Sequence, residues 1–166
     1  TFSAVSAPVQ YAALAAYSNN HEVRDYVARC TRIHQACGEY LFRGLTELGI
    51  VSSTPQGAFY LFLDFSRFRE ELRTMGIYTD EQLCEHLLDE HGVALLPGAD
   101  FYYPMHLYGA RLATVDYDGE AAYQAALQED IDDGFVERHC PHLQSGLARL
   151  ADFVRSLGAA EDAVSN

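Results

Sequence analysis

Arg111 is the side chain of this sequence whose position most strongly suggests a chemical task. It opens an otherwise apolar run with the pattern of a strand, Leu112-Ala-Thr-Val115. A guanidinium group stays charged in proteins, and burying it without a partner is costly, so this position calls for a carboxylate. Two kinds of carboxylate fit. One is an Asp or Glu of the same chain, and the other is a bound ligand that accepts two parallel hydrogen bonds.

Lysine, the residue of many cofactor and phosphate sites, is absent. The 166 residues contain 11 basic side chains, all of them arginine, and 24 acidic ones, for a formal net charge of −13. This excludes a Schiff-base lysine, a P-loop lysine and a lysine general base within the chain. The acidity also disfavours nucleic-acid binding. The acidic run 129–133 lacks the positions of a calcium-binding EF-hand, so we expect a solvated loop there.

Histidine and cysteine could bind a metal, but their spacing does not predict a site. His86 and His91 are five residues apart, which places them on different faces of a helix. His139, Cys140 and His142 lie at the expected start of another helix, with no second ligand pair in view. Because zinc needs three or four convergent ligands, we expect no metal.

The cysteine pattern and the lack of long apolar runs predict a cytoplasmic protein. Cys30, Cys37, Cys84 and Cys140 are scattered, without a CxxC pair, which favours reduced thiols. No apolar run approaches the ~18 residues of a membrane span. The pattern of a secretory signal peptide is absent too. We therefore expect no membrane partner.

Two helices are predicted in the first 48 residues. A short helix covers 7–17, with Ser6 as its cap and Pro8 in its first turn. A long amphipathic helix follows over 21–48, and Gly49 is its expected stop. Its apolar face consists of Val23, Val27, Cys30, His34, Cys37, Leu41, Leu45 and Leu48.

The rest of the chain predicts a small sheet with helices. Strands are expected at 57–64, 93–96 and 111–115. Helices are expected at 66–74, 79–91, 118–127 and 141–157, the last ended by Gly158. Few strands with segregated helices indicate an α+β fold: a two-layer sandwich whose three- to four-stranded sheet carries its helices on one face.

Four segments, taken together, give the chain a family resemblance. They are Ser6-Ala-Pro-Val-Gln10, Pro55-Gln-Gly-Ala-Phe-Tyr-Leu-Phe-Leu-Asp64, Gly92-Val-Ala-Leu-Leu-Pro-Gly-Ala-Asp-Phe101 and Gly109-Ala-Arg-Leu112. In order and spacing this set resembles the C-terminal part of the class I/II aminotransferases, the fold type I enzymes that depend on pyridoxal 5'-phosphate (PLP). The resemblance runs over about residues 1–157.

The resemblance implies that parts of the enzyme outside this sequence hold the cofactor and carry out the catalysis. Residues 1–48 would be an interdomain helical segment, 49–158 the small C-terminal domain, and 159–166 a mobile tail. A large domain would bind PLP and carry the Schiff-base lysine, so no catalytic residue is expected in this chain. Arg111 would hold the α-carboxylate of the amino acid or 2-oxo acid substrate, near the loop 97–101. The enzyme would be a homodimer, and this chain, as a C-terminal piece, would be inactive alone.

Two other interpretations of the function of this chain stay open. A PLP-dependent lyase could use the same scaffold, because fold does not fix reaction type. The chain could also be a non-catalytic interaction or dimerisation domain. It would then use the apolar face of helix 21–48, where Val23, Val27, Cys30 and Leu41 would need cover from a partner.

Overall fold

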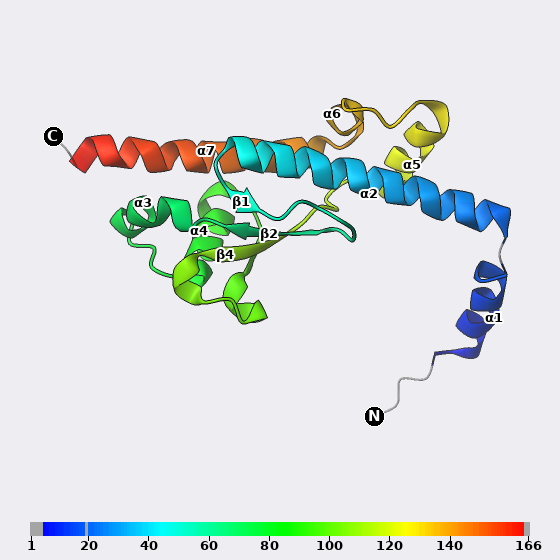
Figure 1. The fold of residues 1–166 in the computed structure, drawn as a ribbon. Helices are drawn as coiled ribbons and strands as arrows, with labels where there is room; N and C mark the ends of the chain where they lie inside the picture. The colour runs from blue at the N-terminus through cyan, green and yellow to red at the C-terminus, as the bar shows by residue number, and fades with distance from the viewer. Residues whose placement is uncertain (1–4, 19, 165–166) are drawn as a thin grey trace.

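The computed structural model describes residues 5–18 and 20–164, and within them it shows an α+β fold with a four-stranded antiparallel sheet (Figure 1). The predicted fold class is thereby confirmed. The helices are α1 (Ala7–Ala16), α2 (His21–Glu47), α3 (Arg69–Thr74), α4 (Asp80–His91), α5 (Gly119–Gln128), α6 (Phe135–His139) and α7 (Pro141–Val164). The strands are β1 (Val51–Ser52), β2 (Tyr60–Asp64), β3 (Leu96–Pro97) and β4 (Gly109–Ala113), and the short 3-10 helices are η1 (Ser66–Phe68), η2 (Gly98–Phe101) and η3 (Met105–Leu107).

The sheet has the order β1-β2-β4-β3, and its two faces differ sharply. Leu61 pairs with Leu112 and Leu63 with Ala110, so these side chains share one face. That face belongs to the core, which α2, α4 and α7 also line. Phe62 pairs with Arg111 on the opposite face, which we call the open face. The alternation confirms a two-layer arrangement with helices on one side.

Helix α2 is buried over only half of its length. Asn20 caps it by accepting a hydrogen bond from the Glu22 N–H at 3.0 Å. Leu41 is 3% exposed, which contradicts the expectation that it needs cover from a partner, because the sheet and α7 already pack there. Val27 is 54% exposed, since the sheet does not extend under the first half of the helix.

Helix α1 stands away from the rest of the chain (Figure 1). None of its side chains is buried, and the Ser6 side chain makes no cap hydrogen bond. Pro8 lies in the first turn, as predicted. The expected break after this helix includes Asn19, which lies outside the described residues.

The predicted start and end of α4 are confirmed. The Thr79 hydroxyl accepts from the Gln82 N–H at 3.3 Å, and the Gln82 side chain accepts from the Tyr78 N–H at 2.7 Å. The helix ends at Gly92, whose φ of 63° is left-handed.

Two predicted strands are shifted along the sequence. The strand expected at 93–96 is Leu96–Pro97, because only these residues pair with β4. The strand expected at 111–115 is Gly109–Ala113, whose register with β2 begins at Gly109 opposite Asp64. Strand β1 and helix α6 were not predicted, since two and five residues are too few to show a period.

Helix α7 begins at Pro141 as predicted but runs past Gly158 to Val164. An internal glycine costs a helix only about 1 kcal/mol relative to alanine, so it does not by itself end one.

Two histidines of α4 lie close together. The rings of His86 and His91 are 5.7 Å apart, and each contacts the ring of Phe153, a fully buried residue of α7. The expectation that their spacing separates them is therefore wrong, because His91 occupies the last turn, next to Gly92.

All four cysteines are unbridged thiols, and Cys37 and Cys140 approach to 3.9 Å between their sulfur atoms. Among the side chains that the structure describes, those of residues 5–18 and 20–158, no group of three or more His, Cys, Asp or Glu could hold a metal ion. Within the same ranges, no helix is both long and apolar enough to cross a membrane.

Candidate functional site

Arg111 lies on the open face with its guanidinium group between two aromatic rings. Its Cζ atom is 4.2 Å from the ring centroid of Tyr60 and 4.4 Å from that of Phe101. Each such contact contributes about 0.5–2 kcal/mol, depending on solvent exposure. Both rings therefore contact the guanidinium group, whose five N–H donors project from its edge and suit a carboxylate.

An internal carboxylate partner for Arg111 is not observed. In the described part of the chain, no Asp or Glu forms an ion pair with it. Asp64, the acidic residue of the neighbouring strand, is engaged elsewhere: it accepts from the Tyr103 O–H at 2.9 Å and from the Ser66 N–H at 2.7 Å.

A second aromatic pair borders the site. The rings of Phe62 and Tyr103 meet edge to face at 5.0 Å, a favoured geometry for aromatic contacts. Burial, followed by the hydrogen bond to the Asp64 carboxylate, raises the pKa of the Tyr103 phenol. The Tyr103 hydroxyl therefore stays protonated at neutral pH and acts as a hydrogen-bond donor.

Two glycines allow the turn after β3 to lie directly on β4. A Cβ atom on Gly98 would stand 3.1 Å from the backbone of Gly109, and one on Gly109 would stand 2.4 Å from the Tyr103 ring. Larger residues would push η2 away from the strand. This close approach brings Phe101, the last residue of η2, over Arg111. The loop 97–101 thus flanks the arginine.

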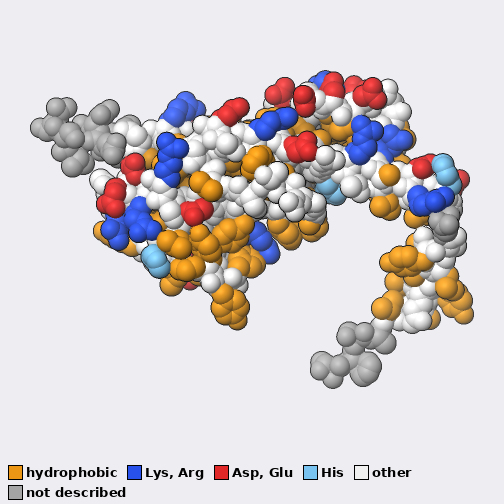
Figure 2. Space-filling view, in the orientation of Figure 1, with side chains coloured by type: hydrophobic (Ala, Val, Ile, Leu, Met, Phe, Trp, Pro, Cys, Tyr) orange, Lys and Arg blue, Asp and Glu red, His pale blue; other side chains and the backbone are white. Residues whose placement is uncertain are grey.

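The open face is apolar and exposed. Hydrophobic side chains gather over β4 and the 98–107 segment, in the lower part of the view in Figure 2. The exposed large residues of this region are Phe59, Tyr60, Leu96, Phe101, Tyr102 and Met105. A monomer rarely leaves such a patch uncovered, which indicates a surface that meets another body.

One cavity lies beside the arginine, because one of its lining residues, Tyr60, also contacts Arg111. It has a volume of about 430 Å³ and is bounded by α2 and by the segment 55–61. Arg111 is not among its lining residues and stays partly exposed at the surface. A ligand held by Arg111 would therefore need a second surface to enclose it.

Sequence reasoning identified Arg111 but missed the roles of Tyr60 and Phe101. The available signals were the aromatic density of 57–64 and of the loop 99–108. Alternation along β2 could have placed Tyr60 on the open face. Nothing in the sequence indicates that Phe101 also contacts the cation, because that contact depends on the fold of η2.

This structure is an α+β domain whose open sheet face presents an arginine held between aromatic rings. Residues 1–114 match the family model for aminotransferase class I and II. That match covers more than half of the chain, and the chain belongs to this family.

Curated relatives agree with this assignment. A bifunctional aspartate aminotransferase and glutamate/aspartate-prephenate aminotransferase of Petunia hybrida is 37% identical over 102 residues, which are 60% of this chain and 21% of the relative. The aspartate/prephenate aminotransferase of Thermus thermophilus is 35% identical over 92 residues, 55% of this chain and 22% of the relative. The chain therefore spans about a fifth of the length of these relatives.

Solved structures show the same fold relationship. The crystal structure of an aspartate aminotransferase from Thermotoga maritima has a TM-score of 0.53 at 25% identity, covering 92% of this chain and 30% of the other. A mutant of the Thermus thermophilus aspartate aminotransferase complexed with tryptophan has a TM-score of 0.56 at 27% identity, covering 86% of this chain and 28% of the other.

Proposed function

We propose that this chain is the C-terminal part of a PLP-dependent aminotransferase that transfers an amino group between an amino acid and a 2-oxo acid. Residues 1–48 would form the interdomain helical segment, 49–158 the small domain and 159–166 the tail, of which 159–164 continue helix α7. The family assignment and the small share of each relative that the chain covers support this proposal. So does the open apolar face, which suits contact with a large domain.

The observation that carries the proposal is the environment of Arg111. Its guanidinium group contacts Tyr60 and Phe101, forms no ion pair among the described residues, and carries its N–H donors along its edge. A carboxylate fits this edge through two parallel hydrogen bonds. In our proposal Arg111 binds the substrate α-carboxylate in this way and so fixes the orientation of the bonds at the reacting carbon.

The residues of this chain do not fit the task of holding PLP covalently. The family implies PLP in its intact enzymes. A Schiff base with the cofactor aldehyde requires a side-chain amine, and the sequence contains no lysine. The proposed part of this chain in the reaction is therefore confined to holding and orienting the substrate, while other parts of the enzyme hold the cofactor.

Treatment with PLP and borohydride tests whether this chain can hold the cofactor covalently. Because no lysine is present, we expect no pyridoxyl group on any side chain after reduction, as measured by mass spectrometry of proteolytic peptides. Modification at an N-terminal amine is the one reaction expected. An aminotransferase with its own Schiff-base lysine, treated in parallel, provides the positive control. A stable pyridoxyl group on an internal residue of this chain would contradict the proposal.

We also propose that the intact enzyme is a cytoplasmic homodimer. The unbridged thiols support a reducing compartment. Apolar side chains exposed on α1, including Tyr11 at 74% and Leu14 at 69%, support a further protein surface around that helix. The relatives' names include aspartate and prephenate, and a substrate of this enzyme would share with aspartate the α-carboxylate that Arg111 is proposed to bind.

The exposure of α1 also favours the alternative, a non-catalytic dimerisation domain. If this alternative holds, the chain by itself will form a dimer that buries α1 and the first half of α2. Size-exclusion chromatography with light scattering measures the mass directly. Tyr11→Ser combined with Leu14→Ser should then return the protein to a monomer, whereas Tyr102→Ser, at a fully exposed position far from α1, should not. A wild-type monomer at micromolar concentration would eliminate the alternative.

A further inference from the structure

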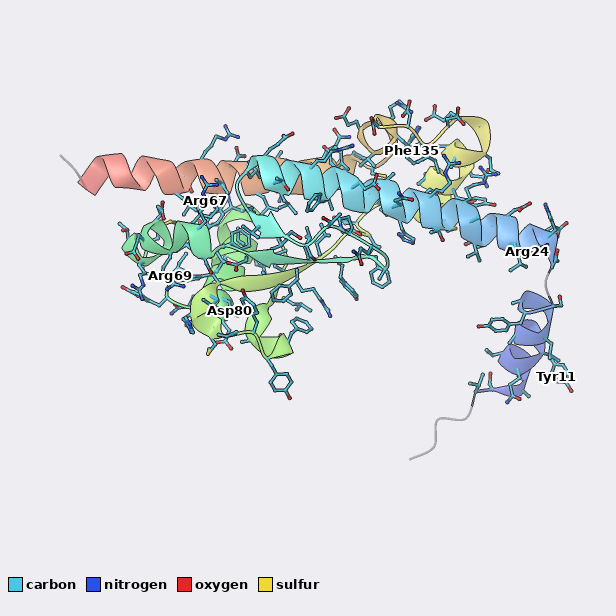
Figure 3. The ribbon with its side chains drawn as sticks, in the orientation of Figure 1. Tyr11, Arg24, Arg67, Arg69, Asp80 and Phe135 are labelled. Carbon is cyan, nitrogen blue, oxygen red and sulfur yellow. The ribbon has the colours of Figure 1, made fainter. Side chains whose placement is uncertain are left out.

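Asp80 is an acidic side chain with no exposed surface. It is 0% exposed and is the first residue of α4 (Figure 3). A fully buried carboxylate is rare in proteins unless it has partners that compensate for lost hydration. Among the described residues, no arginine or histidine forms an ion pair with Asp80.

Two backbone groups compensate the Asp80 charge. Its Oδ1 atom accepts from the Glu81 N–H at 2.9 Å, within α4. Its Oδ2 atom accepts from the Ala99 N–H at 2.8 Å, 19 residues further along the chain. Because its two oxygen atoms bond to residues of two different elements, the Asp80 side chain joins the start of α4 to η2.

The η2 segment carries the ring that covers Arg111. Phe101 lies two residues after Ala99, and its ring centroid is 4.4 Å from the Arg111 Cζ atom. Phe101 is itself 39% exposed, so its ring has limited packing to hold it in place. The position of the Phe101 ring therefore depends on the backbone of η2. Two contacts fix this backbone: Gly98 packs closely on Gly109 of β4, and Asp80 accepts a hydrogen bond from the Ala99 N–H.

We propose that Asp80 is a positioning residue for Arg111. Its buried carboxylate fixes η2, η2 places Phe101 over one face of the guanidinium, and the cation is thereby held with its edge toward a bound carboxylate. What Arg111 binds rests on the proposed function. The positioning itself is a property of this chain alone and can be tested without any activity.

Nuclear magnetic resonance of the chain tests the positioning. In the wild-type protein, the Arg111 side-chain protons should be shifted upfield by the Tyr60 and Phe101 rings. In Asp80→Ala the upfield shift should fall by about half, because one of the two rings leaves. Asp80→Asn keeps one acceptor oxygen and should restore part of the shift. Asp100→Ala, an exposed acidic residue of the same turn, is the matched control and should leave it unchanged.

Kinetics of the intact enzyme test the consequence. Asp80→Ala should raise KM for the amino acid by roughly tenfold, with kcat changed by less than about twofold, because a misplaced Arg111 weakens substrate binding. If Asp80 acts through Phe101, its substitution should have little further effect in a Phe101→Leu background. A merely structural role would lower stability without this non-additivity.

Each outcome decides between the two proposals. An unchanged Arg111 shift in folded Asp80→Ala overturns the positioning role, and if that variant does not fold, an unchanged shift in Asp80→Asn does the same. A reduced shift with the expected rise in KM supports both proposals. A reduced shift, with KM unchanged in both Asp80→Ala and Arg111→Ala, supports the positioning role and contradicts the proposed function.

Discussion

Replacing Arg111 by alanine in the intact enzyme is expected to lower kcat/KM by roughly 30- to 1000-fold, or about 2–4 kcal/mol of transition-state binding. The substitution would remove the two hydrogen bonds that we propose Arg111 makes to the substrate carboxylate, and it leaves Tyr60 and Phe101 without the cation that they contact. KM should rise steeply, because the carboxylate is bound before the reaction as well as during it. Steady-state kinetics with a series of amino acids measures both parameters.

Arg111→Lys separates charge from geometry. Lysine keeps the positive charge but cannot form two parallel hydrogen bonds, so we expect a loss between those of the wild type and Arg111→Ala. Arg155→Ala is the control, because Arg155 lies on α7 in an exposed pair with Asp152, remote from the site. An Arg111→Ala enzyme with unchanged KM would refute the assignment of this residue.

Replacing Leu87 by alanine should lower the free energy of unfolding by about 2–5 kcal/mol. Leu87 is fully buried on α4, between the sheet and the rest of the core. The loss includes the transfer of its side chain and the cavity left behind. Since small domains are stable by only about 5–15 kcal/mol, such a change removes a large share of the total. Urea unfolding followed by circular dichroism measures it.

Leu88 provides a matched comparison on the same helix. It is the next residue, has the same chemistry, and is 52% exposed. Leu88→Ala should therefore change stability by less than about 1 kcal/mol. Equal losses in the two variants would mean that α4 does not pack on the sheet as described, and the placement of Asp80 beside η2 would fail with it.

Local patterns of the sequence predicted most of the helices well. The start of α4 followed from Thr79 and Gln82, and its end from Gly92, because capping depends on residues within one turn. The same reasoning misplaced the end of α7 at Gly158, since a glycine ends a helix only where the chain takes a left-handed conformation. Strand limits shifted because pairing with a neighbour, and not hydrophobicity, defines a strand.

The sequence also overestimated the buried face of α2. Its apolar period runs from Val23 to Leu48, but only the part that lies over the sheet is buried. The spacing of apolar residues shows which side of a helix is apolar. It does not show how far the sheet that covers that side extends along the helix. The tertiary structure shows that Val27 is exposed, because the sheet does not extend under this part of the helix.

The sequence by itself determined that this chain cannot form a lysine imine and that it is an α+β protein, and it predicted a carboxylate partner for Arg111. Only the tertiary structure showed that, among the residues it describes, no Asp or Glu pairs with Arg111 and that two aromatic rings contact the cation. It also joined Asp80 to Ala99. The physical reason is that composition and period are local properties, whereas these contacts join residues 10 or more positions apart, whose meeting depends on how the elements pack.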